Sequence, residues 1–587
     1  MPHRVVIAAA IVLALAASTH GGMSISRAQD LAAKNARQPA IYSNRDRLHP
    51  QFAAHAMVAS QEALATKVGV QILQAGGNAI DAAVAVGFAL AVTLPRAGNL
   101  GGGGFMLIHH AKNNATHALD YRETAPDAAS HDMFVDANGK VDTRAARFSH
   151  RSAGVPGTVA GLTQALKTFG TMPLAQVMAP AIRLAREGIT VTGDLADSLR
   201  ARAKRLKEHA PSANIFFKAD GSAFKVGERL IQADLARSLQ LISEHGAKVF
   251  YQGEIAARIV SDMRIHDGLI RAADLAGYRT VMRSPVFGTY RGHAIASMPP
   301  PSSGGVHLIQ ILNVLEGFPI GFLGHNSADT IHLLTESMKL AYADRASHLG
   351  DADFIRVPVQ GLTSKSYAGV LRERINLQQA RPSAQIAAGR PAMYESNETT
   401  HFSIMDAFGN VVANTYTINF SYGSGIVVPG TGILLNNEMD DFSAKPGAAN
   451  AYGLIGSEAN AIEPRKRPLS SMTPTIVFRA GKALLATGSP GGSRIISTTA
   501  QVIMNVIDHR MNIAEAVAAP RIHHQWFPDE LRVESGISPD TLAILRARGH
   551  AVVENNAMGS ANSVMRTDQG LLGTADSRRR GALAAGY

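Results

Sequence analysis

The chain has 587 residues and a formal net charge of +11. Hydrophobic residues make up 46% of the sequence and charged residues 18%, which is enough apolar material for a large packed core and excludes global disorder. The number of cysteines is 0, which excludes disulfides, cysteine-ligated zinc, iron–sulfur clusters and thiol nucleophiles. The basic residues are scattered without an aromatic ladder or a nucleic-acid motif, so we expect no nucleic-acid partner.

Residues 1–28 are typical of a secretory signal peptide. A short basic start precedes the apolar run Val5–Ala17, and Ser26–Ala28 offers a small-x-small cleavage site, with Ala14–Ala16 as an alternative. The apolar run has about 13 residues, fewer than the ~20 that span a membrane. We expect export to the periplasm or medium of a bacterium, with no membrane span after signal removal; an uncleaved anchor is the alternative.

Two helices are predicted near the start of the mature chain. Ala56–Ala75 has helical periodicity and ends at the helix stop Gly76–Asn78. Ala79–Thr93 is apolar on nearly every side, which predicts a buried helix.

A glycine run follows these helices. Gly101–Gly104 lets backbones approach closely, but it matches no phosphate loop because no Gly-Lys-Ser/Thr follows it. Thr116–Glu123 alternates like a strand, and residues 155–380 are mostly helical patterns broken by Pro and Gly. This first part of the chain is therefore predicted to be helix-rich.

The composition changes near residue 378. Residues 378–398 lack apolar periodicity and predict an exposed linker. Thr399–Met405 and Val411–Phe420 then alternate like strands around the turn residues Asp406–Asn410. The second strand is predicted to place four side chains on one face: Ala413, Thr415, Thr417 and Asn419.

Thr399 opens the first of these strands directly after the predicted linker. A threonine hydroxyl is a weak nucleophile that needs an adjacent base, and a threonine at a chain terminus carries that base as its own α-amino group. An internal threonine acquires this amine only if the preceding bond is cut. By these residues alone, an ordinary strand start remains the simpler interpretation.

Several motifs then occur in a fixed order. They are Gly101–Gly104, Asp120–Pro126, Asn397–Ser403, Gly432–Ser443, Arg467–Met472, Gly488–Arg494, Pro520–Trp526 and Asp576–Gly581. This series resembles the γ-glutamyltransferase (γ-glutamyl transpeptidase) family over nearly all of residues 40–587.

The resemblance implies an N-terminal-nucleophile hydrolase fold of the mixed α/β (α+β) class, a four-layer αββα sandwich. It implies a proenzyme that cuts itself between Glu398 and Thr399. The products would be a helix-rich large subunit, residues 29–398, and a strand-rich small subunit, residues 399–587. Both subunits would remain in one fold as a heterodimer, with no cofactor and no metal.

The resemblance also implies roles for the catalytic residues. Thr399 would be the nucleophile, and Thr417 would orient it through a hydroxyl hydrogen bond. Gly491 and Gly492 would form an oxyanion hole, since glycines let two backbone N–H groups converge on the developing negative oxygen.

The substrate's glutamyl group would need acids for its ammonium and a cation with hydroxyls for its carboxylate. The family's positions assign Glu438 and Asp441, with Asn419 as a further polar partner, to the ammonium. Arg122, Ser470 and Ser471 are assigned to the carboxylate, for which arginine provides a bidentate fork. Tyr452 lies in Pro446–Gly456, which resembles the lid loop present in some members.

The expected activity is transfer of the γ-glutamyl group of glutathione and other γ-glutamyl compounds to water, amino acids or dipeptides. A glutaryl or cephalosporin acylase of the same fold is one alternative, but acids without a partner in a site are costly, and both Glu438 and Asp441 are present. An exported binding protein without catalysis is the other alternative, which the presence of Thr399, Thr417 and the paired glycines disfavours.

Overall fold

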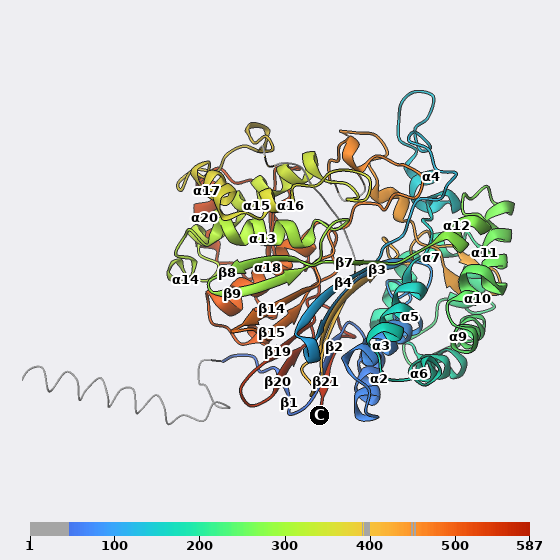
Figure 1. Cartoon of the computed structure of the whole chain (residues 1–587). Helices are drawn as coiled ribbons and strands as arrows, with labels where there is room; N and C mark the ends of the chain where they lie inside the picture. The colour runs from blue at the N-terminus through green and yellow to red at the C-terminus, as the bar shows by residue number, and fades with distance from the viewer. Residues whose placement is uncertain (1–45, 390, 392–399, 448–449, 451–452) are drawn as a thin grey trace, which may run out of the picture. The chain divides into compact units, whose positions relative to one another are not determined.

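Two seven-stranded sheets lie at the centre of the structure, and every strand pairing within them is antiparallel (Figure 1). The computed structural model describes residues 46–389, 391, 400–447, 450 and 453–587. All elements named below belong to the unit formed by residues 50–587.

We call the two sheets A and B. Sheet A contains, in spatial order, β1 (Gln51–Ala53), β20 (Leu571–Thr574), β19 (Ser563–Arg566), β15 (Lys482–Thr487), β14 (Thr475–Arg479), β9 (His293–Ser297) and β8 (Val286–Tyr290). Sheet B contains β21 (Leu583–Gly586), β2 (Met57–Ser60), β10 (Thr400–Met405), β11 (Val411–Thr417), β3 (Gly103–His110), β4 (Ala115–Tyr121) and β7 (Val281–Arg283).

Helices cover the outer face of each sheet (Figure 1). The helices on the side of sheet B are α2 (Ala63–Gln74), α3 (Ala79–Thr93), α5 (Thr158–Phe169), α6 (Leu174–Glu187) and α9 (Ala233–His245). Those on the side of sheet A are α13 (Gly304–Leu315), α15 (Ala328–His348), α18 (Arg494–Ile507) and α19 (Ile513–Ala518). The predicted αββα sandwich is confirmed.

The remaining elements surround this sandwich. The helices are α4 (Thr143–Phe148), α7 (Gly193–Leu206), α8 (Ala210–Phe216), α10 (Lys248–Gln252), α11 (Glu254–Ile265), α12 (Ala272–Gly277), α14 (Ile320–Leu323), α16 (Val359–Leu362), α17 (Lys365–Glu373) and α20 (Pro539–Ala547). The strands are β5 (Ile189–Thr190), β6 (Arg229–Leu230), β12 (Val427–Val428), β13 (Ile433–Leu434), β16 (Ile522–His523), β17 (Leu531–Val533) and β18 (Val552–Glu554).

Three large apolar clusters correspond to the three interfaces between layers. One joins sheet B to its helices, one joins sheet A to its helices, and the third lies between the sheets. β11 contributes to two of them, because Val412 and Tyr416 face the helices while Val411 and Ala413 face sheet A. The predicted alternation of this strand therefore reflects its position between a helical layer and a second sheet.

Each sheet combines strands from both sides of residues 392–399. In sheet B, β10 and β11 lie between β2 and β3, and in sheet A, β14 and β15 lie between β9 and β19. Neither part of the chain contains a complete sheet, so the two parts depend on each other for their backbone hydrogen bonds.

α3 forms as the sequence predicts. Asn78 and Asp81 make a reciprocal capping box at its start, and all fifteen residues of the helix are buried. The helix predicted for Ala56–Ala75 is wrong in its first part, where Met57–Ser60 forms β2 between β10 and β21. Glu62 then caps α2 with its carboxylate. Long-range strand pairing overrides the local helical pattern at β2.

The predicted linker is only partly exposed. Among its described residues, Ala380, Ser383 and Ile386 are buried. The Trp526 indole N–H is within 3.0 Å of the carbonyl oxygens of both Ser383 and Ile386, and Ser383 Oγ donates to Asp529. This stretch is therefore attached to the sheet A side of the molecule. No helix formed by the described residues is both long and apolar enough to cross a bilayer.

The cluster between the sheets should contribute measurably to stability. Leu107 of β3 is fully buried there, and Leu107→Ala should lower the free energy of unfolding by about 2–5 kcal/mol, measured by urea denaturation. The control is Phe322→Ala, whose side chain is 90% exposed and which should change stability by less than about 0.5 kcal/mol. Equal effects of the two variants would contradict the assignment of this core.

Candidate active site

Thr417 ends β11, and a sharp turn follows it. Asn419 has a φ of 68°, and its backbone N–H donates to Thr417 Oγ1 at 2.7 Å. Asn419 Nδ2 donates to the carbonyl of Asn437 at 3.0 Å. The expectation that Asn419 continues the strand face is wrong because the left-handed residue ends the strand, yet Thr417 and Asn419 line the same cavity.

The glycine run lets the chain pass beside Thr417. A Cβ on Gly102 would lie 1.9 Å from the Thr417 carbonyl oxygen, and one on Gly101 would lie 2.1 Å from that of Leu434. Asn99 Nδ2 donates to the Thr417 carbonyl, and Asn99 Oδ1 accepts from the Gly102 N–H, both at 2.9 Å. The run thus has a packing role that positions Thr417, as close backbone approach requires.

Arg122 lies just after β4 and is fully buried. Its guanidinium contacts Glu438 Oε1 at 2.6 Å and Asp441 Oδ2 at 2.7 Å, and Glu123 Oε2 is 3.5 Å away. Its Nε donates to the carbonyl of Pro468 at 3.2 Å. The structure therefore brings the predicted carboxylate ligand and the two predicted ammonium ligands into one ion cluster.

Three carboxyl groups surround the Arg122 guanidinium, and the charge of a second arginine, Arg345, also acts on Asp441. Burial would lower the pKa of Arg122, but the charges of Glu438, Glu123 and Asp441 outweigh that effect and raise it. Burial raises the pKa of Glu438 and of Asp441, and it raises that of Glu123 to about 7. Glu438 Oε2 and Asp441 Oδ1 have no hydrogen-bond partner within the part of the chain that the structure describes. The site is therefore suited to an additional cation or hydrogen-bond donor.

The paired glycines lie just before the N-terminus of α18. Gly491 and Gly492 have φ values of 133° and 70°, which side-chain-bearing residues rarely adopt, and they directly precede α18. The N-terminus of a helix carries partial positive charge, so backbone N–H groups there favour an anionic oxygen. This location agrees with the chemistry expected of an oxyanion hole.

The ring of His401 packs against the glycine loop. It is fully buried, and its two ring nitrogens lie 2.9 Å from Thr415 Oγ1 and 2.8 Å from Ser403 Oγ. Burial lowers its pKa to about 3, so the ring is neutral at pH 7. A Cβ on Gly488 would lie 2.5 Å from His401 Nδ1, so the loop can approach the ring only through a glycine.

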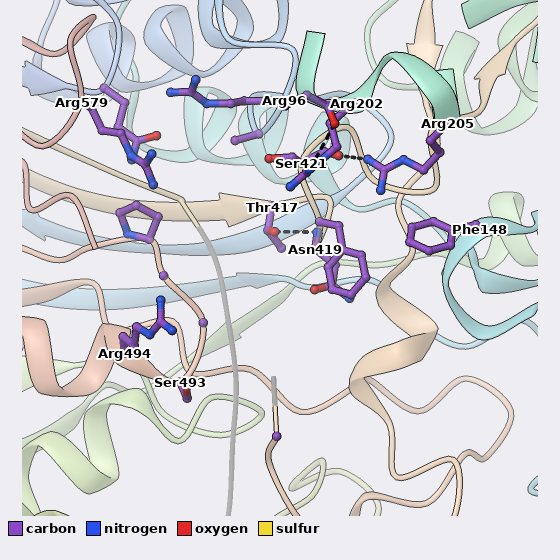
Figure 2. Close-up of a pocket in the computed structure, with 18 of the residues that line it drawn as sticks. Arg96, Phe148, Arg202, Arg205, Thr417, Asn419, Ser421, Ser493, Arg494 and Arg579 are labelled. Carbon is purple, nitrogen blue, oxygen red and sulfur yellow. Dashed lines mark hydrogen bonds between the residues drawn. The ribbon is translucent and has the colours of Figure 1, made fainter. Parts of the chain in front are cut away.

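A cavity of about 1110 Å³ lies between the end of β11 and the loop that carries the paired glycines (Figure 2). Thr417, Asn419, Gly491 and Gly492 all line it. The Arg122 cluster does not line this cavity, and Asp441 lines a separate, smaller one. The cluster is connected to the large cavity through Asn419, whose side chain donates to the carbonyl of Asn437, the residue before Glu438.

The two predicted serines lie beside the same cluster. Ser470 and Ser471 are fully buried, and the Ser470 N–H donates to the carbonyl of Pro301 at 3.1 Å. Their segment is attached to Arg122 through the Pro468 carbonyl. Three predicted residues, Glu398, Thr399 and Tyr452, lie outside the described residues.

Among the residues that the structure describes, two groups of side chains away from this cavity could hold a metal ion. They are His150, Asp262 and His266, and His332, Glu336 and His550. Neither group lines the cavity, and Lys339 Nζ already lies 3.0 Å from Glu336 Oε1. Nothing in either geometry connects a metal to the cavity.

Comparison with known proteins decides the family. The model of the family Gamma-glutamyltranspeptidase matches residues 65–586. The chain belongs to the γ-glutamyltranspeptidase family.

Relatives and solved structures agree with this assignment. The chain is 54% identical over 544 residues to the glutathione hydrolase proenzyme of Escherichia coli (strain K12), covering 92% of this chain and 93% of that protein. The cephalosporin acylase from Bacillus halodurans superposes with a TM-score of 0.83 at 30% identity, covering 94% of this chain and 99% of that one. A γ-glutamyltranspeptidase chain from Helicobacter pylori gives a TM-score of 0.55 at 44% identity, covering 59% of this chain and 97% of that one.

Sequence reasoning overlooked several residues that organise this γ-glutamyltranspeptidase site. Glu123 follows Arg122 in a motif already noted, but only the fold shows it within the ion cluster. Asn436 Nδ2 is 2.8 Å from the carbonyl oxygens of both Gly101 and Gly154, so it fixes the acidic segment to the glycine run. Asn99 acts similarly on Thr417. In the sequence, the pair Asn436–Asn437 directly before the acidic run Glu438–Asp441 was the feature that could have indicated Asn436.

Glu123 should make stability depend on pH. Its pKa is raised to about 7 when folded, so its stabilising contribution is complete below ~4.3, the unfolded value, and is lost as pH rises through 7. Glu123→Gln should reduce the loss of stability between pH 5 and 8, measured as urea midpoints at each pH. The exposed control Glu187→Gln should keep the wild-type pH profile, and an unchanged profile in Glu123→Gln would refute the prediction.

Proposed function

We propose that this chain acts as a γ-glutamyltransferase and glutathione hydrolase, made as a self-cleaving proenzyme. The observation that carries the proposal is a buried arginine–carboxylate cluster that the hydrogen bond between Asn419 and Asn437 links to a large cavity. Thr417, Gly491 and Gly492 line that cavity. Membership of the γ-glutamyltranspeptidase family supports the reaction, and the high identity to a glutathione hydrolase proenzyme supports the donor.

The proposed cleavage separates Glu398 from Thr399. It would give a large subunit, residues 29–398, and a small subunit, residues 399–587, after removal of the signal 1–28. The position of β10 supports this, since Thr400 pairs with Tyr416, the residue before Thr417. The shared sheets would hold the two products together as a heterodimer, and the H. pylori chain that matches 59% of this chain is consistent with separate subunits.

The proposed reaction is acyl transfer through an ester. Thr399 Oγ attacks the γ-carbonyl carbon, and its proton passes to the Thr399 α-amino group, whose pKa near 8 suits a base at neutral pH. The Gly491 and Gly492 N–H groups stabilise the tetrahedral oxyanion, where each such donor is worth about 3–4 kcal/mol. The C–N bond breaks, the amine leaves with the proton, and water or an acceptor amine then attacks the γ-glutamyl-threonine ester.

Recognition of the glutamyl group follows from the ion cluster. The α-ammonium would donate to the oxygens of Glu438 and Asp441 that have no partner among the described residues, and its charge would favour the ionised form of these acids. The α-carboxylate would bind Arg122 together with Ser470 and Ser471. Arg122 then lies between the bound carboxylate and the two protein acids, and Asn419 adds a polar contact at the cavity wall.

Two further assignments rest on the sequence. Tyr452 in Pro446–Gly456 is proposed to close over the bound glutamyl group and limit access of water. Export to the periplasm or medium follows from the predicted signal peptide. Amino acids and dipeptides are the proposed acceptors.

A cephalosporin acylase is the second candidate, favoured by the structural similarity to the B. halodurans enzyme. Glutaryl substrates of such acylases carry side chains without an α-ammonium, so they would leave Glu438 and Asp441 without a cation. Comparing a γ-glutamyl anilide with its glutaryl analogue separates the two functions, because the proposed function requires preference for the γ-glutamyl compound.

Self-cleavage should depend on one hydroxyl. Thr399→Ala should remain a single chain in intact-mass spectrometry, since no Oγ is present to attack the Glu398 carbonyl. The control Thr399→Ser retains a hydroxyl and should still yield two fragments. Two fragments from Thr399→Ala would disprove the assignment of the nucleophile.

Asp441→Asn should change donor selectivity. Arg122 keeps Glu438 and Glu123 as partners, so the fold should tolerate the loss of one charge. A lost charged hydrogen bond is worth ~1.5–3 kcal/mol, so kcat/KM for γ-glutamyl-p-nitroanilide should fall roughly 10–150-fold, mainly through KM. Activity on the glutaryl analogue should fall far less. Equal losses on both substrates would mean that Asp441 does not bind the ammonium.

A further inference from the structure

The walls of the large cavity are strongly basic. Its described lining includes eight lysine or arginine side chains and one carboxylate, that of Glu208. Arg202, Lys204 and Arg205 come from α7, while Arg96 and Arg579 come from loops remote from α7 in sequence. Figure 2 shows Arg96, Arg202 and Arg205 on one side of Thr417 and Asn419. Several separate segments therefore direct positive charge into one cavity.

Some of this charge is balanced by protein groups and some is not. Arg96 pairs with Asp194, and Arg144 pairs with Glu208 at 3.2 Å. Within the described ranges, no carboxylate lies within ion-pair distance of Arg202, Lys204 or Arg579. These three side chains are exposed and are not held in ion pairs by the described residues, so they are available to an anionic ligand.

The pKa of Arg205 reflects its burial beside another arginine. Burial and the charge of Arg202 lower the pKa of Arg205 to about 10. Arg122 shows the opposite shift because acids surround it. A carboxylate entering the cavity would reverse the unfavourable repulsion among these guanidinium groups.

The location of the charge indicates which part of a substrate it contacts. Thr417, Gly491 and Gly492 line this cavity, whereas the buried Arg122 cluster proposed to bind the glutamyl head does not. A donor with its γ-carbonyl at the glycines would therefore extend its leaving group into the basic cavity. The concave shape favours a small ligand over an extended macromolecular surface.

We propose that this basic cavity is a subsite for leaving groups that carry two or more carboxylates, so that acidic γ-glutamyl peptides are preferred donors. The inference rests on the proposed function, because it assumes that the γ-amide is cleaved at this cavity. Arg202 and Lys204 would attract the additional carboxylate, and Arg579 would contact it from a second segment. Glutathione, whose leaving group has a single carboxylate, would use only part of this subsite.

The test compares two donors of nearly equal size, γ-glutamyl-glutamate and γ-glutamyl-glutamine. At low ionic strength, kcat/KM should be at least about fivefold higher for the acidic donor, and 0.5 M NaCl should reduce this ratio towards one, because the Debye length at that salt is only a few ångströms. Arg202→Gln combined with Lys204→Gln should also reduce the ratio towards one, while activity on γ-glutamyl-p-nitroanilide falls by at most about threefold.

The control removes the same charge elsewhere. Arg183→Gln combined with Arg264→Gln alters two exposed helix residues that do not line this cavity, and it should retain the wild-type ratio. A wild-type ratio near one, or a ratio that survives in Arg202→Gln/Lys204→Gln, would overturn the subsite.

A direct binding measurement tests the anionic subsite independently of catalysis. Calorimetry should show that α-linked triglutamate binds at least about fivefold more tightly than triglutamine, and that only the α7 double variant loses the difference. If γ-glutamyl-p-nitroanilide is not hydrolysed at all, the proposed function fails, but this binding result still decides whether the anionic subsite exists. Equal binding of the two peptides would refute it.

Discussion

One buried guanidinium connects the segments on which the site depends. Arg122 follows β4, and it contacts Glu438 and Asp441 from the loop after β13 and the carbonyl of Pro468 from a third segment. Removing these charges from water costs several kcal/mol for each ion, so the cluster is favourable only with close ion pairs and additional hydrogen bonds. Because the acids outnumber the arginine, the same cluster that fixes the loops is also prepared for a cationic group.

Glycines determine how closely the other segments can approach. Gly102 passes beside the carbonyl of Thr417, and Gly488 lies against the ring of His401, at distances that exclude any side chain. Thr417 and the Gly491–Gly492 pair are thus positioned by backbone contacts within packed sheets. These close backbone contacts hold the N–H groups of the site in fixed positions, which suits a reaction that depends on preorganised N–H donors.

Two regions of opposite charge meet at Asn419. Its side-chain amide donates to the carbonyl of Asn437, which precedes Glu438 of the acidic cluster around Arg122. Asn419 itself lines the basic cavity together with Arg202 and Arg205. A zwitterionic head group and an anionic tail would each find complementary charge across this boundary. The net charge of +11 gives no indication of this separation, because it sums over scattered residues.

The sequence by itself determined the fold class, the family and the motifs from which the site is built, since long ordered motifs and the apolar pattern of α3 are local properties of the chain. It misjudged Met57–Ser60, whose strand conformation depends on pairing with residues of β10 and β21, and Asn419, whose left-handed backbone ends β11. Only the tertiary structure placed Glu123 beside Arg122, Asn436 against the glycine run and the basic side chains of α7 on the cavity of Thr417. Most of these contacts join residues that are far apart in the chain, so no local sequence pattern encodes them. Glu123 and Arg122 are adjacent, but tertiary packing sets the directions of their side chains.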